Sequence, residues 1–237
     1  MIPVCYFLMR RTAVIIKPER CVYSLNLHRF AVRNKEGCVK NVAKTFSMNP
    51  ERVAYFEAAG WRAYYDRKWL KMVRLIVALC QEQFRIPFPM SLFAAYYTAR
   101  ASAAWVPVEH DERKVLNYLR KFYGVARRYA GLQFDVRRVA ALELRYFEVH
   151  RRLSGQPEKE EFLQSLVDLH CALFGLTPEQ ARESAQWRLQ AATTVDRITS
   201  KSSNDIEGDW AKLEEDLCRC YQSIARERQK REPVSTI

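Results

Sequence analysis

The chain has 237 residues, of which 49% are hydrophobic, and it contains only 7 Gly and 9 Pro. This composition allows a sizeable core and argues against a β fold, which needs more turn residues. The formal net charge of +12 suggests an anionic partner such as nucleic acid, whereas no apolar run approaches the roughly 20 residues of a membrane span. We therefore expect no membrane association.

Cysteine usage and the first residues point to a cytoplasmic protein. The seven Cys residues are an odd number and form no Cys-x-x-Cys pair, which is typical of free thiols in a reducing compartment. The apolar stretch 1–9 is followed by Arg10 and Arg11, whereas a secretory signal places its positive charge first. A cytoplasmic location follows from both observations.

Residues 1–47 differ from the rest of the chain. They show no sustained 3.6-residue period and contain strand-like fragments at 13–16 and 21–27. Residues 1–48 hold nine Lys or Arg residues against two Glu residues, a net charge of +7, which is more than half of the total. We expect either a basic peripheral segment, such as a hairpin or tail, or an extension before a chain whose functional part begins at Met48. The candidate nucleic-acid contacts in it are Arg10, Arg11, Lys17, Arg20, Arg29 and Arg33.

From residue 48 onward the sequence has a nearly continuous helical pattern. The Asn-Pro-Glu sequence at 49–51 combines an N-cap residue, a proline at the first helical position and a carboxylate in the first turn. The Thr-Pro-Glu-Gln sequence at 177–180 is a capping box. Glycines and prolines separate the apolar-periodic stretches in between. The expected helices span roughly 50–84, 90–105, 111–130, 136–153, 158–174, 178–199 and 209–229.

These elements predict an all-α protein. Residues 48–237 are expected to form a single, mostly antiparallel bundle of six or seven helices, because the connections between them are short. No repeat of 20–50 residues is visible, which argues against a solenoid. Residues 1–47 are expected to lie at the periphery of the bundle.

One apolar stripe contains the clearest chemical signal. Val139, Tyr146 and Phe147 lie on one face of the predicted helix 136–153, because apolar residues three or four positions apart align on a helix. Glu143 and His150 occupy the same stripe. A carboxylate and an imidazole on a buried face need partners or shifted pKa values, so we expect both residues to be buried in a polar network.

Further titratable residues interrupt the other stripes. Glu57 and His170 lie on apolar faces of their helices, and Arg100 follows Tyr96 by four residues. If these faces meet, Glu57 or Glu143 pairs with Arg100, while the two histidines bond a tyrosine hydroxyl or a backbone carbonyl. The expected buried polar network consists of Glu57, Arg100, Glu143, His150 and His170.

Two alternatives use the same residues chemically. Carboxylate and imidazole ligands from facing helices can hold a metal ion, so Glu57, Glu143, His150 and His170 are candidate metal ligands. The di-metal pattern Glu-x-x-His is absent from the sequence. The second alternative is a ligand pocket with these groups as anchors, lined by Tyr64, Tyr65, Tyr96, Tyr97 and Tyr146.

The function favoured by the sequence is a non-catalytic helical interaction or regulatory protein with a protein partner. The core pattern is strong, and neither a phosphate-binding glycine loop nor a Gly-x-Ser-x-Gly or His-Glu-x-x-His motif occurs. No cofactor is predicted apart from the metal ion considered above. The alternatives are a helical-bundle metal binder or enzyme, and a basic nucleic-acid-binding accessory protein. Basic doublets in the body, at 127–128, 137–138 and 151–152, are expected on solvated faces.

Overall fold

The computed structural model describes residues 45–231, and this part of the chain is all-helical, with no strand. It contains eight helices rather than six or seven, and none of them is long and apolar enough to cross a membrane. The helices are α1 (Pro50–Tyr65), α2 (Trp69–Phe84), α3 (Met90–Trp105), α4 (Glu112–Tyr129), α5 (Val136–Leu153), α6 (Glu160–Phe174), α7 (Pro178–Thr199) and α8 (Ile206–Gln229).

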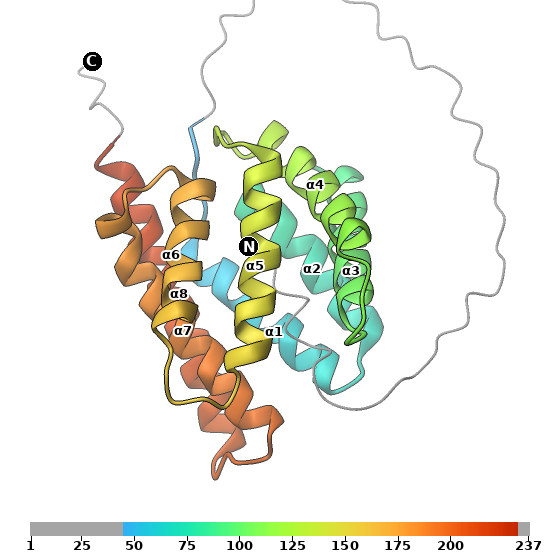
Figure 1. Ribbon diagram of the computed structural model, residues 1–237. Helices are drawn as coiled ribbons and strands as arrows, with labels where there is room; N and C mark the ends of the chain where they lie inside the picture. Colours follow the sequence, from blue (N-terminus) through green and yellow to red (C-terminus); the bar gives the residue numbers. More distant parts are fainter. Residues whose placement is uncertain (1–44, 232–237) are drawn as a thin grey trace, which may run out of the picture.

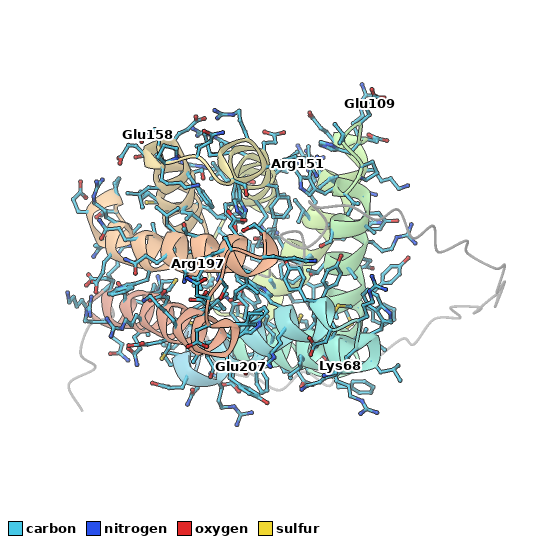
Figure 2. All side chains as sticks on the ribbon, turned by 90° about the horizontal axis from the view of Figure 1, so that it is seen from below. Lys68, Glu109, Arg151, Glu158, Arg197 and Glu207 are labelled. Carbon is cyan, nitrogen blue, oxygen red and sulfur yellow. The ribbon has the colours of Figure 1, made fainter. Side chains whose placement is uncertain are left out.

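Consecutive helices pack against each other, and α8 also packs against α1, so that the row of helices closes. Figure 1 shows α6, α7 and α8 on one side of α5 and α2, α3 and α4 on the other. An ion pair joins α1 to α8: Arg62 donates to Glu207 at the start of α8, at 2.8 Å. A second ion pair, between Arg197 and Asp209, joins α7 to α8. Arg197 and Glu207 are both labelled in the view from below (Figure 2).

The eighth helix arises because the stretch predicted as one helix, 50–84, is interrupted after Tyr65. Arg67 adopts the left-handed region with φ 57°, which ends a helix although only glycine enters that region readily. The rings of Tyr64 and Trp69 meet edge to face across the turn, 5.4 Å between centroids. Neither glycine nor proline marks this position, so the helical period continues through it in the sequence.

The helix starts that the sequence predicts at residues 50 and 178 are confirmed. The side chain of Asn49 accepts a hydrogen bond from the backbone N–H of Arg52 at 2.8 Å. Thr177 and Gln180 form both bonds of the capping box. Upstream of the first cap, the ring of Phe46 is buried and lies 5.8 Å from that of Phe174, so the core begins two residues before Met48. Residues 1–44 lie outside the described part, and the predicted boundary at 47/48 stays a prediction.

The chain consists of two halves with the same plan, α1–α4 and α5–α8. Each position in 82–103 has the same class of exposure as the position 90 residues later, in 172–193. Positions 49–58 match 135–144 in the same way, and both stretches contain Arg-Val-Ala followed by Glu57 or Glu143. The offset is 86 residues for that second pair of stretches, and an offset of 98 residues aligns α4 with α8 and matches Tyr123 with Tyr221. The two halves therefore offer an internal comparison, position by position.

Two glycines test how the helix ends are built. Gly175, beyond α6, has φ +67°, whereas Gly124 lies in exposed helix with no other atom within 4 Å of an added Cβ. We expect Gly175→Ala to lower the free energy of unfolding by about 1 kcal/mol, because a Cβ is strained at positive φ. Gly124→Ala should raise it by about 0.5–1 kcal/mol. Urea unfolding followed by circular dichroism measures both; equal effects would contradict the assigned backbone conformations.

Candidate functional site

Four of the five residues expected in a buried polar network are withdrawn from solvent. Glu57, Glu143 and His150 are at most 2% exposed, and His170 is 0% exposed. Arg100, the fifth, is exposed. The four buried side chains do not form one continuous hydrogen-bonded group; each has a different partner.

A bidentate ion pair occupies the centre of the core. Arg188 of α7 donates through Nη1 to Glu57 Oε2 at 2.8 Å and through Nη2 to Glu57 Oε1 at 2.5 Å. The hydroxyl of Tyr221, on α8, donates to Glu57 Oε2 at 2.5 Å. The Arg188 guanidinium also lies 5.5 Å from the ring centroid of Trp61. Four contacts thus join α1, α7 and α8 around one carboxylate.

Burial and charge act in opposite directions on this pair. Burial alone would lower the pKa of Arg188, but the charge and hydrogen bonds of Glu57 hold that pKa well above its ordinary value. Burial and the Glu57 charge raise the pKa of Tyr221 well above 10. The guanidinium is therefore charged and the phenol protonated at neutral pH, so both donate to the carboxylate, and the guanidinium binds it at two points.

Glu143 has the corresponding tyrosine but no arginine. The Tyr123 hydroxyl donates to Glu143 Oε2 at 2.9 Å, as Tyr221 does to Glu57 in the other half. The position that matches Arg188 is Thr98, whose hydroxyl donates to the carbonyl of Ala94 at 3.1 Å. Burial raises the pKa of Glu143. The core therefore pairs one carboxylate with a cation and leaves the other with a phenol.

His150 lies among aromatic rings. Its imidazole stacks on Phe162 with centroids 4.6 Å apart and an interplanar angle of 19°, and on Tyr146 at 5.9 Å. The Nε2 atom is 3.4 Å from Asp196 Oδ2. Burial lowers the pKa of His150, although Asp196 acts to raise it. The histidine is therefore packed among aromatic rings and has a polar contact with α7.

His170 has a defined tautomer. Its Nδ1 lies 2.7 Å from Ser184 Oγ, and that hydroxyl donates to the carbonyl of Ala181 at 2.9 Å. Because the hydroxyl proton is used there, Nδ1–H donates to the serine oxygen. Nε2 then carries a lone pair, is buried, and has no hydrogen-bond partner within residues 45–231. Burial lowers the pKa of His170 to about 3, so the ring is neutral.

The structure corrects the position of Arg100. Its guanidinium lies 5.8 Å from the ring centroid of Tyr96 and 5.3 Å from that of Tyr118, on the outside of the bundle. The inward face of α3 instead consists of small residues, among them Ala94, Thr98 and Ala101. Periodicity placed Arg100 near Tyr96 correctly but assigned the pair to the wrong face.

Arg188 is the residue that sequence reasoning missed. It lies on the stripe of α7 formed by small buried residues, between Ser184 and Ala191. An arginine within a stripe of alanine and serine is a readable signal, because small neighbours leave room for a long side chain to enter the core. The sequence predicts the helix 178–199 but does not show which of its faces points into the core.

The buried groups do not form a metal centre in the described part of the chain. No group of three or more His, Cys, Asp or Glu side chains that could hold a metal ion occurs there. Glu57, Glu143, His150 and His170 instead contact Arg188, Tyr123, Asp196 and Ser184, respectively. Of the tyrosines considered for a pocket, Tyr146 is fully buried whereas Tyr96 is 49% exposed. The nucleic-acid candidates, Arg10 to Arg33, lie outside the described residues.

The outer surface differs between the halves in its apolar residues. Large apolar side chains are exposed on α2, α3 and the turn between them: Leu70 (78%), Phe88 (70%), Leu92 (46%), Phe93 (50%) and Tyr96 (49%). We name these five residues the α3 face. In the second half, the positions of Leu70, Leu92, Phe93 and Tyr96 are taken by Glu160, Arg182, Glu183 and Gln186.

The two halves also differ in how many of their surface cations form ion pairs. In the second half Arg182 pairs with Glu160, Arg226 with Glu183, and Arg219 with Glu215. Helix α4 has one acidic residue, Glu112, and six cations that form no ion pair with a carboxylate of residues 45–231. These cations are Arg113, Lys114, Arg120, Lys121, Arg127 and Arg128.

Comparison of the chain with protein-family models, with curated proteins and with solved structures finds no match. The matched positions of the two halves, α1–α4 and α5–α8, therefore provide the comparison for the site.

Removal of one partner of the central ion pair is expected to destabilise the core strongly. Arg188→Met leaves the Glu57 carboxylate buried without a counter-charge and should lower the free energy of unfolding by about 3–5 kcal/mol. Adding Glu57→Gln to this variant should restore part of the loss. Glu143→Gln is the matched control and should cost about 1 kcal/mol or less, because Glu143 has no cation. Chemical denaturation at pH 7 tests the set, and equal losses in Arg188→Met and Glu143→Gln would refute the assignment.

His170 is expected to make the protein sensitive to acid. Its folded pKa of about 3 lies below the ordinary 6.5, so between these values the unfolded chain binds a proton that the folded chain does not. Stability attributable to His170 is thus present above pH 6.5 and falls with decreasing pH by up to about 1.4 kcal/mol per unit. Urea unfolding between pH 7 and pH 4 should show a smaller loss in His170→Gln than in the wild type. His110→Gln is the control and should follow the wild type.

Proposed function

We propose that this chain is a non-catalytic helical interaction protein that binds a protein partner through the α3 face. The observation that supports this is the contrast between halves of one chain. The same structural positions are polar on α7 and apolar on α3, although both are exposed to the same degree. Exposure of large apolar side chains is therefore not a consequence of the fold.

The α3 face is large enough to matter for binding. Leu92 and Tyr96 lie four residues apart on α3 and therefore on one side of the helix, and Phe88 lies in the turn just before α3. Each aromatic ring offers roughly 150–250 Å² when covered, so the three rings, each about half exposed or more, present on the order of 300 Å². This is about the area of the largest apolar patch on a typical monomeric protein, which is often functional.

The buried polar groups support a structural role over catalysis. Glu57 and Arg188 neutralise each other, Glu143 is held by a phenol, and His170 is neutral and fully buried. None of these groups belongs to the exposed α3 face, where a partner would bind. The four cysteines of the described residues are free thiols, which supports the cytoplasm as the proposed location.

Photocrosslinking tests the proposed function. A photoreactive p-benzoylphenylalanine at position 93 should crosslink to a discrete partner in cells of the source organism. The same residue at position 183, the matched site on α7, should give no such product. Purified wild-type chain added to an extract should compete for the partner, whereas the variant Leu92→Arg/Phe93→Glu should not.

This double variant is expected to fold, because it installs on α3 the residues that α7 carries at the same positions. Equal crosslinking at positions 93 and 183, absence of a product at position 93, or competition by the double variant would each contradict the proposed function. Circular dichroism and thermal unfolding of the double variant verify its fold.

A further inference from the structure

We infer that the segment bound by the α3 face is an acidic amphipathic helix of a protein partner, lying across α3 and α4. This rests on the proposed function and deepens it. Apolar side chains of the helix would cover the α3 face, and its carboxylates would pair with the cations of α4. The first half lacks carboxylates that the second half has at the matching positions, and this difference supports the inference.

Three carboxylates that neutralise α7 and α8 have uncharged counterparts on α3 and α4. Glu215, which pairs with Arg219, corresponds to Asn117, and Asp216, which pairs with Lys212, corresponds to Tyr118. Glu183, which pairs with Arg226, corresponds to Phe93. The matching cations, Lys121, Lys114 and Arg128, are retained.

Cations kept without their carboxylates create a site for external negative charge. Lys121 instead lies over tyrosine rings, with Nζ 5.8 Å from the centroid of Tyr97 and 5.7 Å from that of Tyr118. Arg219 lies over Trp187 in the second half, at 4.6 Å, but it also binds Glu215. A carboxylate supplied by a partner would complete on α4 the arrangement that α8 completes within the chain.

The same surface is a better match for protein than for nucleic acid. Single-stranded nucleic acid binds by stacking bases on open aromatic faces. The ring faces of Tyr96, Tyr97 and Tyr118 already carry Arg100 or Lys121 at 5.3–5.8 Å. The side chains left open are Phe88, Phe93 and the aliphatic Leu70 and Leu92, and the two leucines suit apolar side chains rather than bases.

A helix is the form of partner segment that fits these elements. The described residues contain no strand, and therefore no sheet edge to which an extended segment could add. Two packed helices such as α3 and α4 form a seam into which a third helix can pack its ridges. Glu109, Asp111 and Glu112 at the start of α4 would repel acidic residues. The carboxylates are therefore expected near Arg127 and Arg128, at the other end of α4.

The test uses the full-length chain and a fluorescein-labelled synthetic peptide of about 20 residues, long enough to span a helix of this size. The peptide has leucine at i, i+3, i+4 and i+7 spacing and glutamate on its flanks. A second peptide has glutamine in place of every glutamate. Fluorescence anisotropy should show at least about tenfold weaker binding of the glutamine peptide, a difference of about 1.4 kcal/mol.

Two variants identify the surface. Asn117→Glu supplies the missing internal carboxylate to Lys121 and should weaken binding of the glutamate peptide about tenfold. It should also fold normally, because a Glu–Lys pair four residues apart stabilises a helix. Gln164→Glu, at an exposed site on α6, makes the same charge change elsewhere and should leave binding unchanged. Leu92→Arg/Phe93→Glu should abolish binding of both peptides.

Several results would overturn the inference. These are equal binding of the two peptides, no effect of Asn117→Glu, and tighter binding to oligothymidine or to phosphatidylglycerol vesicles than to the glutamate peptide. The inference would also be overturned if the chain alone sediments as a dimer and the variant Leu92→Arg/Phe93→Glu sediments as a monomer. If the glutamine peptide binds as tightly and the double variant still abolishes binding, the acidic partner is wrong but the α3 face stands. Absence of crosslinking at position 93 is instead the failure of the proposed function.

Discussion

The ion pair between Arg188 and Glu57 is the constraint on which the arrangement of the helices depends. Both side chains are fully buried, and the two residues are separated by most of the folded chain. Removing two charges from water costs several kcal/mol for each ion, which only close geometry and further hydrogen bonds offset. Two guanidinium bonds and the Tyr221 hydroxyl supply them. Any other packing of α1, α7 and α8 would leave a buried charge without its partner, so the pair disfavours alternatives more than it adds net stability.

The two halves share this core chemistry unequally, and they diverge completely outside. A tyrosine holds a buried glutamate in each half, but only the second half adds an arginine, where the first has Thr98. On the surface the second half binds its own charges in pairs between α7, α8 and α6. The first half replaces the acidic members of these pairs by Phe93, Asn117 and Tyr118 and keeps the cations. The second half thus pairs these cations within the chain, whereas the matching cations of α4 form no ion pair with a carboxylate of residues 45–231.

The sequence determines the helices and their inward faces better than it determines their partners. Caps at Asn49 and Thr177 fix helix starts locally, and the apolar stripe of 136–153 places Glu143 and His150 inside. Periodicity shows which face of a helix is buried, but not which helix will meet it. Arg100 and Arg188 both lie four residues from a polar neighbour on a helix, and only the packing of α1 and α7 on the same helix, α8, shows which of them reaches Glu57. The break at Arg67 has no glycine or proline, and the correspondence between halves rests on exposure rather than on identical residues. For these reasons neither could be read from one sequence.

Stability and function place opposite demands on polar groups, and this chain separates them in space. Buried charges must find partners within the fold, because an unpaired one destabilises it, and such satisfied groups have little capacity left for a ligand. Exposed cations without partners cost little, since water solvates them. They can therefore persist where they serve a contact outside the chain. Apolar side chains on the surface bring no stability to the isolated molecule, yet Leu92, Phe93 and Tyr96 lie on α3, which packs against α4, and polar residues take their matched positions on α7. The exposed apolar side chains of α3 and the cations of α4 are not needed to hold the fold together. They are therefore the groups that the proposed partner would contact.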